Sequence, residues 1–131
     1  MSVLDELREI LEDHELDVEV RDGELQGVHG TLPIAIVIAI DEDNNRATIE
    51  LRALEDLEDV MNELVESGED LRSIVDEVLS EIRDIAIELS RILESRGYKV
   101  SVNIREGESD VRDLMEDIIE EYEEVVGVEE E

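Results

Sequence analysis

The chain has 131 residues, of which 41 are acidic and 11 are basic, so its formal net charge is −30. It contains no cysteine, which excludes a disulfide framework, a cysteine-based zinc finger and a thiol nucleophile. A polyanion attracts neither nucleic acid nor anionic lipid through its average surface. No apolar run approaches the roughly 18 residues of a membrane span, and the first residues do not resemble a signal peptide. We therefore expect no nucleic-acid partner, no membrane association and a cytoplasmic location.

The composition favours a folded domain over a disordered chain. High net charge predicts disorder only where hydrophobic content is low, and here 41% of the residues are apolar. Abundant carboxylates, a single lysine (Lys99) and an aliphatic apolar set resemble the composition of proteins from salt-accumulating archaea. Strong salt tightens apolar burial, so we expect adaptation to high salt. Two alternatives stay open: a designed or purely structural protein with no natural ligand, and a nucleic-acid mimic whose carboxylates imitate phosphates.

The first half of the chain predicts one helix and a meander of strands. Apolar residues at helical spacing predict a helix over residues 3–13. Alternation of apolar and polar residues predicts a strand from Leu16 to Val20, and Asp22-Gly23 is typical of a two-residue hairpin turn. Further strands are expected over residues 34–40 and 47–52.

One stretch of this half breaks the alternation. Between Glu24 and Leu32, the apolar residues Leu25 and Val28 do not share the parity of one strand face. Gly27 falls in the same stretch, as does Gly30. We therefore expect a bulge or a close backbone approach there.

The second half predicts three helices and one more strand. The helices are expected over residues 55–66, 67–96 and 110–126, and the strand from Tyr98 to Arg105. The resulting order α-ββββ-αα-β-α predicts an α+β fold, with an antiparallel sheet of four to five strands and helices packed mainly on one face. We expect a single domain over residues 1–126, followed by an acidic C-terminal tail over residues 127–131.

Strand alternation divides this sheet into a helix-covered face and an outer face. The isoleucines of the strand 34–40 point to the covered face. A wholly apolar strand in the middle of a sheet needs cover on both sides, so we expect the outer face to be a contact surface. Its residues are small, hydroxylated or cationic, and three basic residues there stand against one acidic residue, Glu50. The candidate contact residues are Ala35, Val37, Ala39, Thr48, Arg52, Lys99, Ser101, Asn103 and Arg105.

The same pattern is also typical of an ordinary solvated sheet face, because outer strand positions favour Thr, Arg and Lys. If the face is an interface, either a homodimer or a protein or peptide partner covers it. A two-fold dimer would bring Arg52, Lys99 and Arg105 of both copies together unless Glu50 pairs with them. We therefore expect a non-enzymatic binding or assembly domain that uses its outer sheet face.

No motif points to catalysis, a metal or a cofactor. The turn from Asp41 to Asn45 begins like an EF-hand loop, but Arg46 stands where that loop needs glycine and Arg52 where it needs glutamate. His14 and His29 lack the spacing of a zinc motif. Carboxylate pairs at helical spacing are typical of a solvated helix face. We expect no enzyme activity, no cofactor and no specific metal site.

The layout of a small acidic domain that opens with a helix and a meander of strands resembles the class I type III secretion chaperones. The resemblance covers roughly the first half of the chain and rests on layout, with no shared motif. It implies an acidic dimer that holds a segment of a partner protein. The long helix over residues 67–96 and the single later strand, where that family has a hairpin, depart from the layout.

The charge density leads to a prediction about salt. A folded chain of this mass exposes roughly 7,000 Å², so its negative charges repel one another across a Debye length of about 10 Å at 0.1 M salt. Added salt screens this repulsion, which is stronger in the compact state than in the unfolded state. We expect the thermal unfolding midpoint, measured by circular dichroism, to rise by several degrees between low and molar KCl. A midpoint that does not change would contradict this account.

Overall fold

The computed structural model describes residues 3–21 and 23–129, with side chains as far as Glu123. The expected turn residue Asp22 and the tail residues Glu130 and Glu131 lie outside the described residues. Helices and strands follow one another in the predicted order, which confirms the α+β class. The elements are α1 (Val3–Asp13), β1 (Asp17–Arg21), β2 (Glu24–Val28), β3 (Ile34–Asp41), β4 (Arg46–Ala53), α2 (Leu57–Glu66), α3 (Leu71–Ser95), β5 (Lys99–Asn103) and α4 (Arg105–Glu129).

The five strands form one sheet in the order β1-β2-β3-β4-β5, so β1 and β5 are its edges. The first four strands pair antiparallel, whereas β5 runs parallel to β4. The sheet is therefore mostly antiparallel, with one parallel pairing that the sequence pattern does not indicate. The connection explains this pairing, because α2 and α3 lie between β4 and β5 and return the chain to the end of the sheet where β4 begins.

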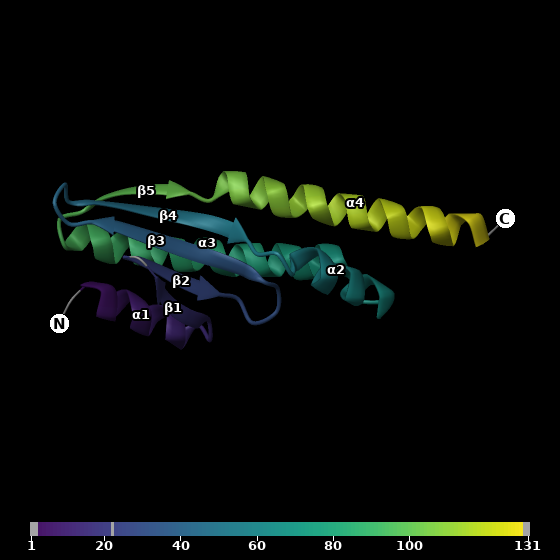
Figure 1. Ribbon diagram of the computed structural model, residues 1–131, viewed down its shortest axis with the longest axis horizontal. Helices are drawn as coiled ribbons and strands as arrows, with labels where there is room; N and C mark the ends of the chain where they lie inside the picture. Colours follow the sequence, from purple (N-terminus) through teal and green to yellow (C-terminus); the bar gives the residue numbers. More distant parts are fainter. Residues whose placement is uncertain (1–2, 22, 130–131) are drawn as a thin grey trace.

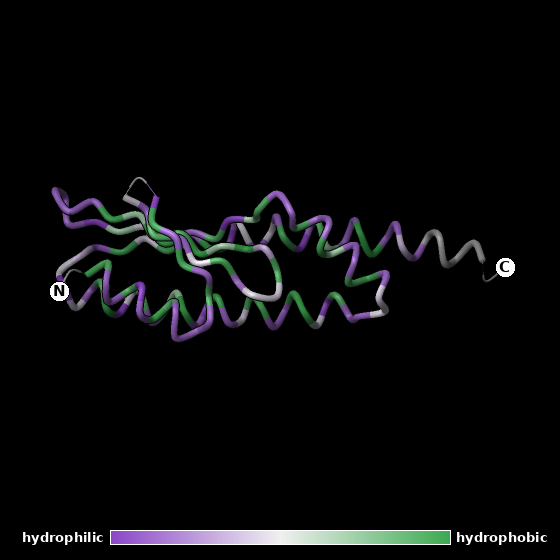
Figure 2. The backbone as a smooth tube through the Cα atoms, turned by 60° about the horizontal axis from the view of Figure 1, so that its bottom comes forward, coloured by the Kyte–Doolittle hydropathy of each residue, from purple (hydrophilic) through white to green (hydrophobic). Residues whose placement is uncertain are grey.

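The helices α1 and α3 pack on one face of the sheet. Figure 2 shows the strands as one layer and α1 and α3 as a second layer beside it. Alternation along β3 points Ile34, Ile36 and Ile38 into the space between the layers, where all three are fully buried. Burial of a side chain of this size contributes roughly 1.5–3 kcal/mol. This aliphatic layer is therefore the core from which the fold gains its stability.

Local signals set the ends of α3. The Asp70 carboxylate accepts a hydrogen bond from the Ser73 N–H at 3.3 Å, which caps the first turn. Gly97 has a φ of 91°, a left-handed conformation that ends the helix at little steric cost. The helix between them is continuous.

This helix is longer than the sheet that it covers. The 25 residues of α3 span about 37 Å, whereas the 8 residues of β3 span about 27 Å. Figure 1 shows α2 and α4 beyond the end of the strands, where both pack against α3. Arg72 of α3 donates two hydrogen bonds to Glu116 of α4, and these hold the pKa of the Glu116 carboxyl below its ordinary value. The overhang is thus covered by the chain's own helices.

The regular pairing of β2 excludes a bulge. Each residue from Glu24 to Val28 pairs with one residue on β1 and one on β3. The alternative expectation, a close approach, is confirmed at Gly27, where a Cβ would lie 3.2 Å from side-chain atoms of Leu11 and Leu16. The missing side chain lets α1 pack closely against the sheet.

Two predicted boundaries near the C-terminus are wrong. β5 ends at Asn103, and Arg105, expected on this strand, is the first residue of α4. The helix starts there rather than at Asp110 because the Glu108 N–H donates to the Ile104 carbonyl at 3.0 Å. The first turn of α4 contains no apolar residue, so hydrophobic periodicity does not indicate it. At its other end α4 continues to Glu129, so residues 127–129 of the expected tail are helical.

Gly107 allows the first turn of α4 to lie against β4. A Cβ at this position would overlap the Leu51 carbonyl oxygen and lie 2.7 Å from Leu51 Cβ. These are the backbone oxygen and the Cβ of the buried residue Leu51, which cannot rotate away. Only glycine therefore fits where the helix meets the sheet.

Replacing Gly107 with alanine is expected to destabilise the fold, although alanine favours a helix by about 1 kcal/mol. The clash with Leu51 should lower the free energy of unfolding by about 1–3 kcal/mol, measured by urea denaturation at fixed KCl. Gly30→Ala is the matched control, because a Cβ there meets no atom within 4 Å. Equal stability of the two variants would contradict the described packing.

Candidate functional site

The structure places all but one of the predicted contact residues on the outer face of the sheet. The register gives this face Ala35, Val37, Ala39, Thr48, Arg52, Lys99, Ser101 and Asn103. The exception is Arg105, which lies at the start of α4. Of the set, Lys99, Ser101 and Asn103 lie on the edge strand β5, and Arg105 follows it closely.

The apolar centre of the outer face is already covered by neighbouring side chains. Ala35 is fully buried and Val37 is 2% exposed, although α1 and α3 lie on the opposite side of the sheet (Figure 2). The register neighbours of Val37 are long and polar, Gln26 and Glu50. Arg52, beside Ala35, reaches to 3.8 Å from Glu50. A partner would meet polar side chains here, and docking on the centre of this face stays a prediction.

The open edge of β5 carries backbone groups that bind no other strand. The Lys99 N–H donates to the Asn45 carbonyl at 2.8 Å, so the backbone groups of Lys99 point toward β4. Successive residues of a strand point these groups to opposite sides. Those of Val100 and Val102 therefore point away from the sheet. Within the described part of the chain, no strand lies beyond β5 to receive them.

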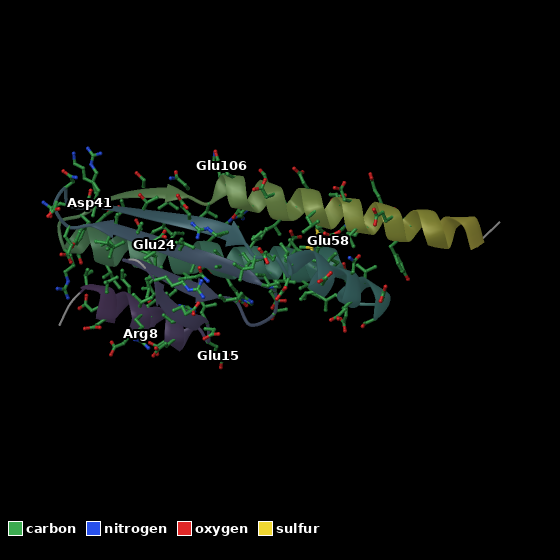
Figure 3. All side chains as sticks on the ribbon, in the orientation of Figure 1. Arg8, Glu15, Glu24, Asp41, Glu58 and Glu106 are labelled. Carbon is green, nitrogen blue, oxygen red and sulfur yellow. The ribbon has the colours of Figure 1, made fainter. Side chains whose placement is uncertain are left out.

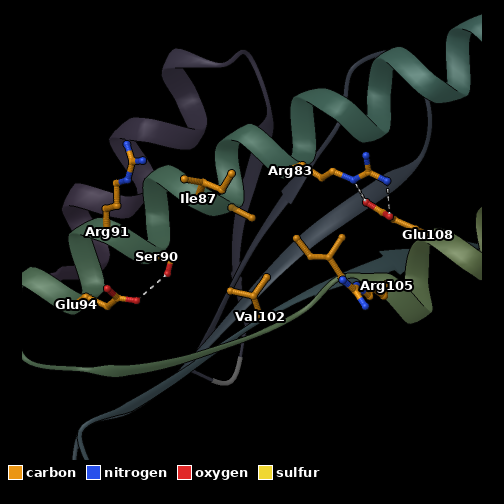
Figure 4. A pocket seen from close by; sticks show the side chains of 10 residues that line it. Arg83, Ile87, Ser90, Arg91, Glu94, Val102, Arg105 and Glu108 are labelled. Carbon is orange, nitrogen blue, oxygen red and sulfur yellow. Dashed lines mark hydrogen bonds and ion pairs between the residues drawn. The ribbon is translucent and has the colours of Figure 1, made fainter.

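A groove of about 700 Å³ lies beside this edge, between α3 and β5. Figure 4 shows Ile87 of α3 and Val102 of β5 on its two walls, and these side chains are 51% and 48% exposed. Ala86 and Ile104 also line the groove. Exposed large hydrophobic side chains are few in the described part of the chain, and two of them meet here. The β5 edge thus combines free backbone groups with apolar surface.

Cations that form no ion pair with a described residue gather around the same strand; Arg46 among them interacts electrostatically with its register partner Asp41. Arg46 and Lys99 are register partners at the start of β5, and Arg91 and Arg105 line the groove. None of the four forms an ion pair with a described residue, whereas each of the other arginines does. Acidic side chains cover much of the remaining surface, as the oxygen atoms in Figure 3 show. Carboxylates also lie near β5, since Glu94 and Glu108 line the groove and Glu50 is the register partner of Asn103. What distinguishes this region is the number of cations that form no ion pair with a described residue.

Arg83 and Glu108 form the wall of the groove where α4 begins. Arg83 Nε lies 2.6 Å from Glu108 Oε1, and Arg83 Nη2 lies 2.7 Å from Glu108 Oε2 (Figure 4). Glu108 is the one buried charged residue of the described chain. The hydrogen bonds that Arg83 donates to Glu108 raise the pKa of Arg83 above its ordinary value. This two-point contact orients the first turn of α4, and with it Arg105, relative to α3.

Sequence reasoning missed this groove. By strand alternation Val102 points to the helix-covered face, so the sequence predicts that it is a core residue. Its side chain is nevertheless exposed, because β5 is an edge strand. Arg105 is predicted on the strand rather than on the helix beside the groove. One signal was available, because Ile87 lies apart from the buried positions of α3.

The two histidines join the N-terminal half of the chain to α3. His29 Nδ1 accepts a hydrogen bond from the Thr31 N–H at 3.0 Å, and His29 Nε2 lies 2.6 Å from a Glu81 carboxylate oxygen. His14 Nε2 lies 3.1 Å from Glu88. These contacts link neighbouring elements and account for both imidazoles.

The acidic turn between β3 and β4 is held by its own side chains. Asn44 Nδ2 donates to Asp41 Oδ2 at 2.7 Å, and this hydrogen bond holds the pKa of the Asp41 carboxyl below its ordinary value. The described side chains contain no group of three or more His, Asp or Glu residues arranged to hold a metal ion. No described helix combines the length and the apolar composition that crossing a membrane requires.

Comparison with known proteins assigns no family: no family model matches the chain, and neither a curated protein nor a solved structure is significantly similar to it. The β5 edge is therefore the candidate site on the strength of its geometry and charge. We define it as the open strand β5 together with the groove beside α3.

Arg83→Met is expected to loosen the wall of the groove. It leaves the buried Glu108 carboxylate without a cation, which should lower the free energy of unfolding by about 1–3 kcal/mol, measured by urea denaturation. Arg8→Met is the matched control, because the ion pair of Arg8 with Glu12 is exposed on both sides and such pairs contribute about 0–1 kcal/mol. If Arg83→Met loses no more stability than Arg8→Met, the pair does not anchor α4.

Proposed function

We propose that this chain is a non-enzymatic binding or assembly domain adapted to high salt, and that it takes up an extended partner segment along the β5 edge. The observation that carries the proposal is the coincidence of three features at one strand. These are backbone groups free to pair, exposed apolar side chains, and cations that form no ion pair with a described residue. Together they favour the contact at the margin of the predicted outer face rather than at its centre.

Strand addition uses each of these features. Val100 and Val102 offer N–H and C=O groups in the positions that an added strand would bind. Such main-chain hydrogen bonds supply affinity, while pockets for alternate side chains supply specificity. The groove receives the side chains that an added strand would point toward α3, and they would cover Ile87 and Val102.

Charge sets the chemistry of the partner and the conditions for binding. Lys99 and Arg105 form no ion pair with a described carboxylate. An added strand with acidic side chains could supply carboxylates at short range, so we expect these two cations to favour an acidic partner. At longer range the net charge of −30 repels any acidic partner. Salt screens the long-range repulsion beyond roughly 8–10 Å. Binding is therefore expected to be stronger at high salt than at low salt.

A role in holding an extended segment is also what the chaperone resemblance implies. The alternative of a designed or purely structural protein gives the opposite expectation, since it assigns no ligand to the β5 edge. The proposal and this alternative can be separated with a defined peptide.

The probe is a synthetic peptide that alternates glutamate and valine, titrated into isotope-labelled protein in molar KCl. We expect its addition to shift the backbone amide resonances of Val100 and Val102 more than those of β3. A peptide that alternates lysine and valine should shift these two resonances several-fold less at the same concentration. Shifts confined to the outer face around Val37, or no saturable shift with either peptide, would contradict docking at the β5 edge.

Val102→Pro provides a matched control. Because the Val102 N–H points away from β4, proline removes an edge donor without removing a bond within the sheet. The variant should keep its circular dichroism spectrum and lose most of its peptide binding. Retained binding by a folded Val102→Pro protein would overturn the proposed geometry.

A further inference from the structure

We propose that the extended segment accepted by the β5 edge is strand β1 of a second copy, so that copies assemble head to tail. This inference rests on the proposed function of β5 and names its partner. Figure 1 shows β5 at one margin of the molecule and β1, with α1, at the opposite margin. The two edges of the sheet are therefore both available in one chain.

The open edge of β1 offers the same backbone pattern as that of β5. The His29 N–H donates to the Ile34 carbonyl at 2.9 Å, so the backbone groups of His29 point toward β3. By alternation, those of Glu24, Gln26 and Val28 point toward β1. They bind their register partners on β1, Asp17, Glu19 and Arg21. The groups of Val18 and Val20 are left pointing to the open edge.

The two edge strands also carry similar side chains, because each has an exposed valine. Val20 of β1 is 53% exposed and Val102 of β5 is 48% exposed. The register places both on the helix-covered face, because each lies in the row that contains Ile38 and Ile49. Joining the two edges would therefore continue the same apolar layer from one copy into the next.

Strand directions allow this union. β1 and β3 run one way, whereas β2, β4 and β5 run the other way. Suppose that the sheet continues from β5 of one copy into β1 of the next, with the helices of both copies on the same side. The strands β5 and β1 then pair antiparallel. Val100 and Val102 would exchange hydrogen bonds with Val18 and Val20 of the second copy.

Charge favours this arrangement over a two-fold pairing of β5 with itself. On the β1 side, the pairing of Val20 with Val100 places Arg21, which is ion-paired with Glu19, opposite Lys99. The pairing of Val18 with Val102 places Asp17, which has no ion-pair partner in the described chain, at the end nearer to Arg105, and α1 packs next to β1. The helix α1 carries acidic residues at 5, 6, 9, 12 and 13 against the single arginine Arg8, and of these acids Glu6 and Glu12 are ion-paired with Arg96 and Arg8. On the β5 side, Arg105 lines the groove and forms no ion pair with a described residue, so it is the cation available to Asp17. A two-fold β5 pairing would instead join two strands that each carry Lys99 and no carboxylate, whereas β1 carries Asp17 and Glu19 against Arg21.

The assembly has a defined symmetry and salt dependence. An interface between two different surfaces of the same chain produces rings where the rotation closes and filaments where it does not. Each added copy brings a net charge of −30, so assembly is expected in molar KCl and dissociation at low salt. Adaptation to high salt and assembly would then be linked.

Cross-linking tests the pairing directly, because the chain contains no cysteine. Val20→Cys protein is mixed with Val102→Cys protein in molar KCl and treated with a short thiol-reactive bifunctional reagent. We expect several-fold more cross-linked dimer in the mixture than with either protein alone. Val20→Cys mixed with Ser80→Cys is the collision control, because Ser80 is exposed on α3. A chain that carries both Val20→Cys and Val102→Cys should yield a ladder of oligomers.

The remaining outcomes separate this inference from the proposed function. If Val102→Cys protein alone cross-links as well as the mixture, β5 pairs with itself, and the head-to-tail inference is overturned while β5 remains a docking edge. If no variant exceeds the collision control but the glutamate–valine peptide shifts Val100 and Val102, the inference fails and the proposed function stands. If neither cross-links nor peptide shifts occur, both fail.

Discussion

The fold depends on an aliphatic layer that is packed closely enough to hold a chain of net charge −30 together. Ile34, Ile36 and Ile38 form the centre of that layer, between the sheet and α3. With no phenylalanine or tryptophan to fill space, apolar burial requires the helices to approach the sheet closely. Gly27 and Gly107 permit this approach, the first beneath α1 and the second where α4 meets β4. Salt would strengthen the fold in two ways, by screening repulsion and by favouring apolar burial.

In the part of the chain that the structure describes, four of the eleven basic residues connect different elements. Arg96 joins α3 to Glu6 of α1, while Arg72 and Arg83 join α3 to α4. Each of these contacts places a positive charge between acidic helices that would otherwise repel one another. Arg46, Arg91, Lys99 and Arg105 make no such contact with described residues and stand around β5. Their position has no role in holding the helices together, which is why the β5 edge carries the functional proposal.

Periodicity predicted most of the elements because burial imposes it. The bounds of α1, the centres of β1, β3 and β4 and the apolar stripe of α3 follow from apolar residues that recur at helical or strand spacing. The alternation breaks in β2, and the sequence left open whether α3 is continuous. The first turn of α4 could not be predicted in this way, since Gly107 and Glu108 are selected by contacts with Leu51 and Arg83 rather than by hydrophobic spacing. The candidate surface was predicted in part. Lys99, Ser101 and Asn103 lie on the strand that the structure favours, whereas Ile87 and the exposure of Val102 depend on where α3 crosses the sheet.

The sequence by itself determined the α+β class, the residues of the isoleucine face and the strongly acidic surface, because each of these follows from local spacing or from composition. Only the tertiary structure decided which strands are edges, that β5 runs parallel to β4, and that Ala35 and Val37 are covered while Val20 and Val102 are not. The reason is that an exposed fraction depends on neighbours that are distant in the chain. Alternation along a strand determines the face of the sheet to which a side chain points. The order of strands determines whether a neighbouring strand covers that side chain.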